Sequence, residues 1–559
     1  MHELRRMPQV QLQSMLGPPR EASSWVFVAP AQLHRNLGAL RDVEPARTGV
    51  LLVESREWLS RRPYHRARLA LILLNMRHFA LELAKAGFAV RYLCVDGTLC
   101  GAVRDFARRH GALQATEWAE REMRAELAPL VKEGLLRPVP DDGWATHRSD
   151  FDGCRRGRQW SMDAFYRAYR RRSGLLMDEA GEPVGGRLSF DVENRQRWNG
   201  APPPPTPPRF RDTPLRREVA ETVEVEFAAH PGTLELGALP GSLADTERLW
   251  SWAKGECLPH FGPYEDAMST RSRGLFHSRM SPVMNLGRIH PTRMAREVEC
   301  MDLPIASKEG FIRQVAGWRE FVRWVHLATD GFRDAWPVAD APGDAGFARW
   351  KGSAWTPAAA PPAGVDGGAR PRALGGDTPL PPVFWGAPSG LHCLDQVVSG
   401  VWDEAWSHHI TRLMVLGNLA TLLDVDAREL ADWFWVAYMD AWDWVVEPNV
   451  LAMATYAAGG VMTTKPYVAG SAYMDRMGDF CQGCEFRPDR DCPVTPLYWA
   501  FLERHQAALQ SNPRLKLAMA SMRKRPAERR AADAATFVHV RDVLVRGERL
   551  RPAGSLPLQ

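Results

Sequence analysis

The sequence predicts two domains, an α/β domain followed by an all-α domain. In the first 140 residues, short apolar runs alternate with a segment whose apolar side chains recur at helical spacing, which is typical of a parallel, doubly wound sheet. From Asp245 onward the pattern changes to long amphipathic segments, which predicts helices. A chain of 559 residues that is 45% hydrophobic is long enough to bury a core in two or three domains.

The α/β prediction depends on one long helix and five candidate strands. The helix is expected over 66–86, followed by Gly87, a residue type that favours a helix C-cap. Glu54 directly follows the second strand, where sheets of this class bind ligands, so it is a candidate cofactor contact; a solvated acid is the alternative. The absence of a G-x-G-x-x-G loop disfavours a nucleotide-dependent dehydrogenase. The strands are expected at 25–29, 49–53, 88–95, 114–118 and 135–139.

Changes in composition suggest the domain boundaries. A basic stretch interleaved with aromatic residues at 148–174 would suit phosphates and stacked bases, or it is a solvated helix face. A proline-rich spacer follows at 201–208. We expect a flexible tail at 1–23, the α/β domain at 24–140, a connector at 141–242, the helical domain at 243–510 with an Ala/Pro/Gly-rich insertion at 332–382, and a C-terminal tail at 511–559.

Composition limits the classes of function. A net charge of only +5 means that any nucleic-acid surface must be a local patch. Nine cysteines at uneven spacing argue against a disulfide framework and for a reducing compartment. Twenty-one tryptophans indicate a large aromatic core or a relay of oxidisable side chains. No apolar run approaches a membrane span and no secretory signal is recognisable, so we expect a cytoplasmic monomer without a membrane partner.

The most informative stretch is 479–499, which reads DFCQGCEFRPDRDCPVTPLYW. Cys481, Cys484 and Cys492 fall within twelve residues, and a C-x-x-C pair brings two thiolates onto one turn. The Cys-Pro that ends the run is typical of bacterial iron–sulfur sites. On spacing alone, a zinc site with His505 as fourth ligand and an iron–sulfur site are equally favoured, ahead of a redox dithiol. Four cysteine ligands would require one more cysteine from upstream.

Other motifs accompany the cysteine segment in a fixed order. They are FHSRMSPVMNLGRI (276–289), EGFIRQVAGWREFVR (309–323), SHHITRLMVLGNLATLL (407–423) and EPNVLAMATYAAGGVMTTKPYVAGSAYMDRM (447–477). Together they resemble the photolyase/cryptochrome family, in particular its iron–sulfur bacterial branch of prokaryotic (6-4) photolyases and bacterial cryptochromes. The resemblance covers most of the chain. It implies an N-terminal Rossmann-like antenna domain, an all-α C-terminal domain that binds FAD, and UV-damaged DNA as the partner.

The resemblance also implies which residues bind a 4Fe-4S cluster. In the iron–sulfur branch, the fourth ligand lies just before the double-histidine helix, and Cys393 stands in that place. Cys393, Cys481, Cys484 and Cys492 are therefore the implied ligands. The gap between Cys484 and Cys492 is shorter than is usual in the branch.

The stretch at 53–83 resembles the second strand and following helix of the family's antenna domain. There Glu54 matches an acid that contacts the antenna chromophore, which in the iron–sulfur branch is 6,7-dimethyl-8-ribityllumazine. The first strand departs from the family. It continues as VAPAQLHRNL (28–37), where relatives show a G-D-Q-L-like turn.

The motif HSRMSPVMNLG (277–287) resembles the family loop T-S-x-L-S-P-x-L-x-x-G. Hydroxyl groups and backbone N–H groups at a helix start can hold a pyrophosphate. Ser278, Ser281 and Asn285 are the candidates for this role in FAD binding, and a plain helix cap is the alternative.

Further residues match the flavin side of the family's site. Arg319 and Asp440 match its salt bridge, and an arginine there can stabilise a reduced, anionic flavin. Asn449 and Glu447 lie in the segment that faces the flavin ring. Val446 stands where the branch has an acidic residue opposite flavin N5. Glu447 comes one residue later, which is a rotation of about 100° around a helix, so it is not expected to substitute.

The double histidine is the implied catalytic point, because His408 and His409 match the family's H-H-x-x-R-L-M. In (6-4) repair a protonated histidine donates a proton to the lesion, and a pKa near neutrality suits this task. The resemblance assigns the proton to His409, supported by His408. Tyr467 matches a lesion-contacting tyrosine, Arg195 a residue that contacts DNA, and Asp191 a residue that binds a divalent ion.

Trp385 and Trp433 match the branch's electron path, and Phe434 stands where a tyrosine often participates. Core packing is the alternative for each tryptophan singly. The resemblance implies a light-driven enzyme that reverses (6-4) pyrimidine photoproducts by electron transfer from reduced FAD. A blue-light photoreceptor with little or no repair is the runner-up. A zinc-stabilised nucleic-acid-binding protein is the third hypothesis.

Overall fold

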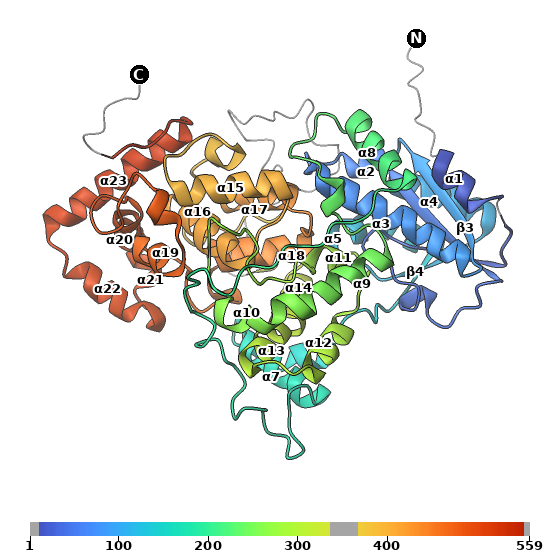
Figure 1. The fold of residues 1–559 in the computed structure, drawn as a ribbon, viewed down its shortest axis with the longest axis horizontal. Helices are drawn as coiled ribbons and strands as arrows, with labels where there is room; N and C mark the ends of the chain where they lie inside the picture. The colour runs from blue at the N-terminus through green and yellow to red at the C-terminus, as the bar shows by residue number, and fades with distance from the viewer. Residues whose placement is uncertain (1–9, 19, 336–366, 553–559) are drawn as a thin grey trace, which may run out of the picture.

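The computed structural model describes residues 10–18, 20–335 and 367–552. It consists of an α/β domain and a helical domain that lie side by side (Figure 1). The α/β domain is coloured blue in Figure 1, and the yellow-to-red helices of the helical domain lie on the opposite side. The predicted fold class is confirmed.

A five-stranded parallel sheet with the order β3-β2-β1-β4-β5 forms the centre of the α/β domain. All five predicted strands are present close to their expected positions. The predicted helix over 66–86 is α3 (Arg66–Lys85), and Gly87 follows it with a left-handed φ of 97°. The strands are β1 (Ser24–Phe27), β2 (Thr48–Ser55), β3 (Ala89–Val95), β4 (Leu113–Thr116) and β5 (Leu136–Val139).

Helices cover both faces of the sheet, and the inner strand β2 is accordingly apolar on both sides. Val50 and Leu52 belong to the same apolar cluster as α3. Leu51 and Val53 belong to the cluster of α4 (Leu99–His110) and α5 (Arg121–Lys132). A parallel sheet buried on both faces requires such continuous apolar strands.

The N-terminal segment departs from the flexible tail expected over 1–23. It contains α1 (Val10–Leu16), which packs against α3 and buries Leu12 completely. Leu12 and Leu16 are one helical turn apart and so present one apolar face to the domain. Residues 1–9 and 19 lie outside the described part of the chain.

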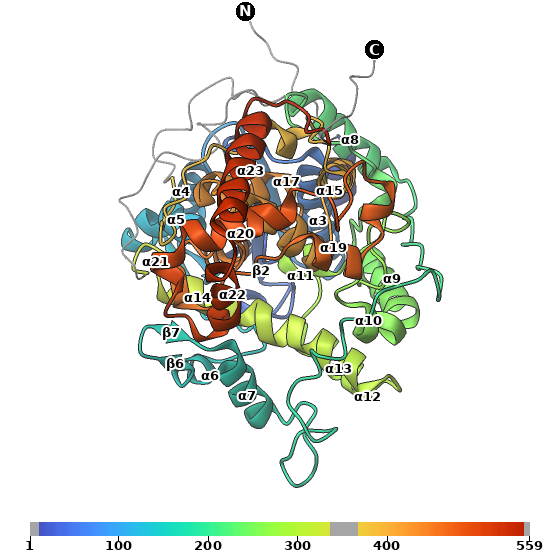
Figure 2. The ribbon, with the colours of Figure 1, turned by 90° about the vertical axis from the view of Figure 1, so that its left-hand side faces the viewer.

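The connector contributes to both domains. It contains α6 (Arg148–Asp152), the short strands β6 (Arg155–Arg156) and β7 (Gln159–Trp160), α7 (Met162–Ser173) and α8 (Pro214–Glu226). Helix α8 packs on α3 and helps to cover the sheet, whereas α7 packs on the helical domain. The long loop between α7 and α8 hangs away from the body of the molecule (Figures 1 and 2).

The described part of the helical domain contains four π-helical stretches, η3 (Ala253–Cys257), η4 (Arg313–Trp318), η7 (Thr411–Gly417) and η8 (Pro448–Ala454). Such turns are rare and are often found at functional sites. The α-helices of the domain include α9 (Leu243–Trp252), α10 (Leu258–Tyr264), α11 (Ser281–Asn285), α12 (Pro291–Cys300), α13 (Ile305–Ile312), α14 (Arg319–Ala328), α15 (His392–Glu404), α16 (Asn418–Leu422), α17 (Ala427–Ala437), α18 (Asp443–Glu447), α19 (Ser471–Met477) and α20 (Val494–Arg504).

The segment expected as a C-terminal tail folds into α22 (Lys516–Arg523) and α23 (Ala527–Val545). Both helices pack against α20. The guanidinium of Arg504 on α20 lies 3.4 Å over the ring of Phe537 on α23, so this segment is joined to the helical domain.

The centre of the Ala/Pro/Gly-rich insertion, residues 336–366, lies outside the described part of the chain. After it, the chain passes beside α17, where Arg370 pairs with Asp426. Within the described ranges, no helix is both long and apolar enough to cross a bilayer.

Candidate functional site

A cavity in the helical domain is built around three of the π-helical stretches, η4, η7 and η8. Gln314 and Trp318 come from η4, Arg412 from η7 and Val450 from η8. Residues from separated parts of the chain thus converge on one largely apolar space with a few polar groups, which is typical of a cofactor site. The predicted site residues that line it are Ser278, Ser281, Asn285, Arg319, His408, His409, Asp440 and Asn449.

A buried ion pair organises the polar side of this cavity. Asp440 accepts two hydrogen bonds from Arg412, at 3.0 and 2.9 Å. Its Oδ2 also accepts a hydrogen bond from Ser281 Oγ at 2.6 Å, and its backbone oxygen accepts one from Asn285 Nδ2 at 2.9 Å. Asp440 therefore joins η7 to α11, the helix of the expected pyrophosphate loop.

The carboxylate of Asp440 pairs with Arg412 and not with Arg319, so the predicted salt bridge between Arg319 and Asp440 is wrong. Arg319 instead donates to Asn285 Oδ1 at 3.1 Å and to Glu320 at 2.9 Å. Arg412 was missed although it is the arginine of the H-H-x-x-R motif. Arg412 comes four residues after His408, so a helix would place both on the same side. This spacing could have identified Arg412 from the sequence.

Arg319 lies close to two tryptophans, Trp144 of the connector and Trp444 on α18. Its guanidinium carbon is 4.4 Å from the ring centroid of Trp144 and 5.2 Å from that of Trp444. Burial lowers the pKa of Arg319, and the adjacent Glu320 partly offsets this. The arginine therefore presents a buried positive charge to the cavity wall.

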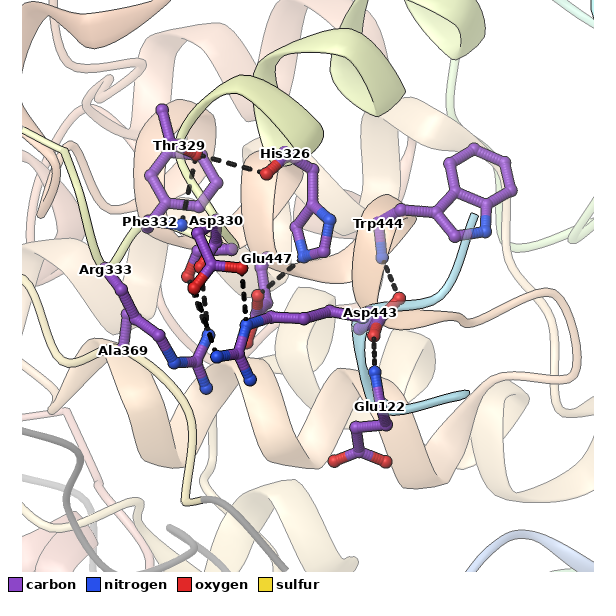
Figure 3. Close-up of polar contacts among 12 residues, drawn as sticks. Glu122, His326, Thr329, Asp330, Phe332, Arg333, Ala369, Asp443, Trp444 and Glu447 are labelled. Carbon is purple, nitrogen blue, oxygen red and sulfur yellow. Dashed lines mark hydrogen bonds and ion pairs between the residues drawn. The ribbon is translucent and has the colours of Figure 1, made fainter. Parts of the chain in front are cut away.

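Val446 and Glu447 point in different directions from α18. Val446 lines the cavity, whereas Glu447 is buried behind it and accepts a hydrogen bond from His326 at 2.8 Å (Figure 3). Glu447 also accepts a hydrogen bond from Arg428 at 2.7 Å. Burial opposes ionisation of Glu447, but Arg428 and His326 outweigh it and lower the pKa of Glu447 to about 2. The carboxylate of Glu447 thus binds His326 and Arg428 and does not face the cavity. This agrees with the expectation that Glu447, one residue after Val446, cannot take the place of an acid at position 446.

Asp443, one turn before Glu447, connects the same helix to the α/β domain. Its carboxylate accepts the backbone N–H of Glu122 on α5 at 3.1 Å, and Glu122 in turn pairs with Arg62 at 2.9 Å. The neighbouring Arg121 pairs with Asp330 at 2.8 Å. Figure 3 shows the contacts of Asp443 and Asp330 around the end of α14. A polar network therefore joins the cavity wall to the α/β domain.

Three histidines, rather than two, meet at the cavity. His408 packs face to face on His277, with ring centroids 4.5 Å apart and planes at 13°. His277 Nε2 donates to the backbone oxygen of Glu265 at 3.1 Å, which fixes the tautomer of the neutral ring. His277 was not among the predicted site residues. The signal was its place in the pyrophosphate motif, where the family loop has threonine.

Burial is the main cause of lowered pKa values at all three histidines. The pKa falls to about 3 for His277 and to about 4 for His409, where Arg412 adds to the effect, and the pKa of His408 is also well below its usual value. His408 is 2% exposed, and its Nδ1 has no hydrogen-bond partner within the described part of the chain. An unsatisfied nitrogen in the wall of a cavity favours a ligand with a polar group there.

The residues expected to contact DNA lie together at the rim of the cavity. Asp191 pairs with Arg195 at 2.6 Å and with Arg313 at 2.9 Å, and Arg313 directly precedes Gln314 of the cavity wall. Burial is the main cause of a raised pKa of Tyr467, and the negative charge of Asp191 adds to it, which places this tyrosine in the same neighbourhood.

Glu265 was not predicted from the sequence, although it lines the cavity and is 5% exposed. It accepts hydrogen bonds from Gln314, at 2.6 Å, and from Asn194. Burial raises its pKa to about 7, and Arg313 opposes this shift. Glu265 therefore supplies a carboxyl group that can carry a proton near neutral pH.

The predicted electron-path tryptophans are linked by a third one. Trp385 stacks on Trp402 with centroids 5.0 Å apart, and Trp402 meets Trp433 at 6.2 Å. Trp433 contacts Phe434 at 5.1 Å and Tyr438 at 6.0 Å, and both of these line the cavity. A continuous series of contacting aromatic rings thus extends from the half-buried Trp385 to the cavity.

The four predicted cysteine ligands line one small cavity with mainly apolar walls. Cys393, at the start of α15, is 9% exposed and lies near Cys481, Cys484 and Cys492, and none of the four forms a disulfide. As the described residues stand, they contain no group of three or more His, Cys, Asp or Glu side chains placed to hold a metal ion. The arrangement brings together thiols from two distant parts of the chain.

His505, the alternative zinc ligand, is not part of this cavity. Its Nε2 lies 2.7 Å from Asp424 Oδ1, next to the pair that Arg504 forms with the same carboxylate. A zinc site with His505 as the fourth ligand is therefore wrong. The histidine belongs to a polar contact between α20 and the end of α16.

Glu54 is buried at the end of β2 rather than solvated. Arg77 on α3 donates to both of its oxygens, at 3.0 and 3.3 Å, and the hydroxyl of Tyr92 donates at 2.8 Å. Arg77 also pairs with Glu218 of α8 at 3.0 Å. The carboxylate thus joins the sheet to α3 and, through Arg77, to α8.

The fold and the cavity define a two-domain protein with a cofactor site in its helical domain. Comparison with known proteins identifies its relatives. A (6-4) photolyase of Agrobacterium fabrum is 31% identical over 512 residues, which is 88% of this chain and 94% of the relative. A family model described as deoxyribodipyrimidine photo-lyase-related protein matches residues 26–237. The chain belongs to the photolyase/cryptochrome family.

Solved structures also align along most of the chain. A class III photolyase of Agrobacterium tumefaciens has a TM-score of 0.49 at 14% identity, over 94% of this chain and 99% of that one. A cryptochrome of Synechocystis sp. PCC6803 has a TM-score of 0.48 at 14% identity, over 94% of this chain and 100% of that one. Membership of the family supports light-dependent DNA repair or photoreception and implies FAD.

A double-mutant cycle distinguishes the observed ion pair from the one that the sequence suggested. The free energies of unfolding of Arg412→Met, Asp440→Asn and the double variant, measured in urea, should give a coupling of about 1–3 kcal/mol. The matching cycle with Arg319→Met should give less than about 1 kcal/mol, because Arg319 reaches Asp440 only through Asn285. A larger coupling to Arg319 than to Arg412 would contradict the arrangement.

Proposed function

We propose that the protein is a (6-4) photolyase, a light-driven enzyme that reverses (6-4) pyrimidine photoproducts in DNA. The observation that carries this proposal is the convergence of the double histidine, the expected flavin-binding residues and the DNA-contacting Arg195 on one cavity and its rim. The relative that matches nearly the whole chain is named a (6-4) photolyase, which supports the same activity.

The cavity residues fit FAD. Ser278 and the hydroxyl of Ser281 lie at the start of α11, where backbone N–H groups can hold a pyrophosphate. Arg319 and Arg412 supply positive charge beside the cavity, and Asn449 and Val446 supply part of its wall. Bound FAD would absorb light and supply the electron for repair. The chain's own residues orient it and exclude water.

The histidines would hold the proton that the lesion needs. His409 is exposed to the cavity, whereas His408 is fixed between His277 and the interior, so His409 is the proton donor and His408 positions it. The surrounding protein keeps the pKa of His409 low, at about 4. Negative phosphates of a bound lesion would raise that pKa toward the range in which a histidine donates protons effectively.

The four cysteines fit a 4Fe-4S cluster. Cys393, Cys481, Cys484 and Cys492 surround one mainly apolar cavity, and an iron–sulfur cluster is held by four thiolates. The cluster would connect the start of α15 to the segment before α20. Binding of such a group contributes directly to folding stability, because the ligands are not assembled in the unfolded chain.

The antenna and the divalent ion have less support in the contacts. Glu54, the implied contact of a lumazine antenna, already receives hydrogen bonds from Arg77 and Tyr92. Asp191, the implied ligand of a divalent ion, is already paired with Arg195 and Arg313. Neither arrangement fits the added group without a rearrangement of these partners. We therefore build no step on either group.

A photoreceptor with little repair is the second candidate function. The observation that favours it is Val446 in the cavity wall, with the adjacent carboxylate of Glu447 turned away and paired with His326 and Arg428. An apolar side chain at this position cannot transfer a proton, so the light-driven redox chemistry of the site would differ from that of relatives with an acid there.

Repair under blue light separates the two functions. Reduced wild-type protein should restore an oligonucleotide that contains one (6-4) photoproduct, as measured by chromatography of the product. His409→Ala should slow repair by about 100-fold to 10,000-fold, because the proton donor is lost. His539→Ala, which removes an exposed histidine on α23, should have no effect. Absence of repair by the reduced wild type would refute the enzyme and leave the photoreceptor.

The iron–sulfur assignment predicts the metal content. Purified wild-type protein should contain iron and acid-labile sulfide, and Cys393→Ser should lose most of both, together with stability, because one ligand is removed. Cys257→Ser changes a buried cysteine that does not line this cavity and should keep the metal. Stoichiometric zinc without sulfide in the wild type would refute the cluster.

If electrons reach bound FAD along the series of aromatic rings from Trp385, the rate at which light reduces FAD in the presence of an external reductant should depend on these rings. Trp402→Phe should slow bleaching of the oxidised flavin band at least about tenfold, since phenylalanine is far harder to oxidise than tryptophan. Trp25→Phe, in the core of the α/β domain, is the control. An unchanged rate in Trp402→Phe would show that Trp385 and Trp433 exchange electrons without this ring.

A further inference from the structure

Val192 is an apolar side chain that the fold displays to solvent. It is 81% exposed, far more than most large apolar residues of the described chain. It belongs to the long loop between α7 and α8, which extends from the body of the molecule (Figure 2). Scattered exposed apolar residues are common on protein surfaces, so the surroundings of Val192 decide its meaning.

The segment that carries Val192 is anchored on both sides. Phe190 is 3% exposed, and its backbone N–H donates to Glu309 on α13 at 3.0 Å. Asn194 is 1% exposed and donates its side-chain amide to Glu265. Between these anchors, the backbone N–H of Glu193 donates to the oxygen of Phe190 at 2.8 Å, which closes a tight turn. Val192 is therefore held outward by a fixed turn, which limits the entropy lost when it contacts a partner.

The turn is joined to the rim of the cavity through Asn194 and Asp191. Asn194 bonds Glu265, which lines the cavity. Asp191 pairs with Arg313, the residue before Gln314 of the cavity wall. Val192 lies next to Asp191 in the chain, so it stands beside the entrance through which a flipped nucleotide would pass.

The charge around the turn suits nucleic acid. Arg195 and Arg197 follow Val192 on the same exposed segment. Arg195 keeps 54% of its side chain exposed despite its pairing with Asp191, so phosphates can reach it. Many DNA-bending proteins insert an apolar side chain between bases and hold the adjacent backbone with basic residues, and Arg195 and Arg197 can take the second role here.

We propose that Val192 is a wedge that fills the gap left in duplex DNA when the two damaged pyrimidines turn into the cavity. This proposal rests on the proposed repair function. Extrusion of the bases breaks stacking and pairing, which disfavours binding. An apolar side chain in the gap covers the faces of the neighbouring bases and restores part of that loss. A single-stranded lesion leaves no such gap, so its binding does not need the wedge.

The test is the dark binding affinity for DNA that contains one (6-4) photoproduct, as a duplex and as a single strand. Val192→Ser should weaken duplex binding about tenfold and leave single-strand binding within about twofold of the wild type. In a duplex with 2-aminopurine opposite the lesion, Val192→Ser should also reduce the fluorescence increase that reports unstacking. Leu517→Ser is the matched control, because Leu517 is 84% exposed on α22 and is expected to leave both affinities unchanged.

The outcomes separate the wedge from the function on which it rests. Wild-type protein that does not prefer the damaged duplex over undamaged DNA would overturn the proposed repair function and the wedge with it. A wild type that prefers the damaged duplex, together with equal duplex affinities for wild type and Val192→Ser, would overturn the wedge alone. Equal losses of duplex and single-strand affinity in Val192→Ser would also overturn it, because they would indicate a general contact.

Discussion

The cavity of the helical domain depends on the buried pair of Arg412 and Asp440. A carboxylate that is 5% exposed needs strong partners, and Asp440 has two hydrogen bonds from Arg412 and one from Ser281. Because these partners belong to η7 and α11, the pair sets the separation of the two walls. Buried ion pairs often contribute little net stability, but they specify geometry when every oxygen is satisfied. Here the geometry is that of a site for a large, charged cofactor.

The π-helical stretches explain how helices that are buried nearly all round can still direct polar side chains inward. A π turn inserts an extra residue into a helix and so shifts the side chains that follow it. Gln314, Arg412 and Asn449 each lie in such a stretch and each line the cavity. The shift is local, so the apolar packing on either side of it continues unchanged.

The sequence was sufficient for the sheet, for α3 and for many of the residues around the cavity, because periodicity and motif order are properties of the chain itself. The sequence was not sufficient to predict which charged side chains pair with one another. Arg319 and Arg412 both follow recognisable motifs, and only the positions of η4 and η7 in space decide which one reaches Asp440. His277 was overlooked for a similar reason, since its ring gains a role only by stacking on His408, which is far away in sequence. Leu12 shows the reverse case: a short amphipathic helix near the N-terminus is stable only because α3 is there to cover it.

The network around Asp443 holds the two domains in a fixed position relative to each other. The contact of Asp443 with Glu122 and the pair of Arg121 with Asp330 connect α5 to the helices behind the cavity. Rotation of one domain against the other would remove the Glu122 N–H from the buried carboxylate of Asp443, which is unfavourable. Any pigment held by the α/β domain would therefore keep a constant separation and orientation relative to a chromophore in the cavity, and resonant transfer of excitation between two dyes is governed by those two quantities.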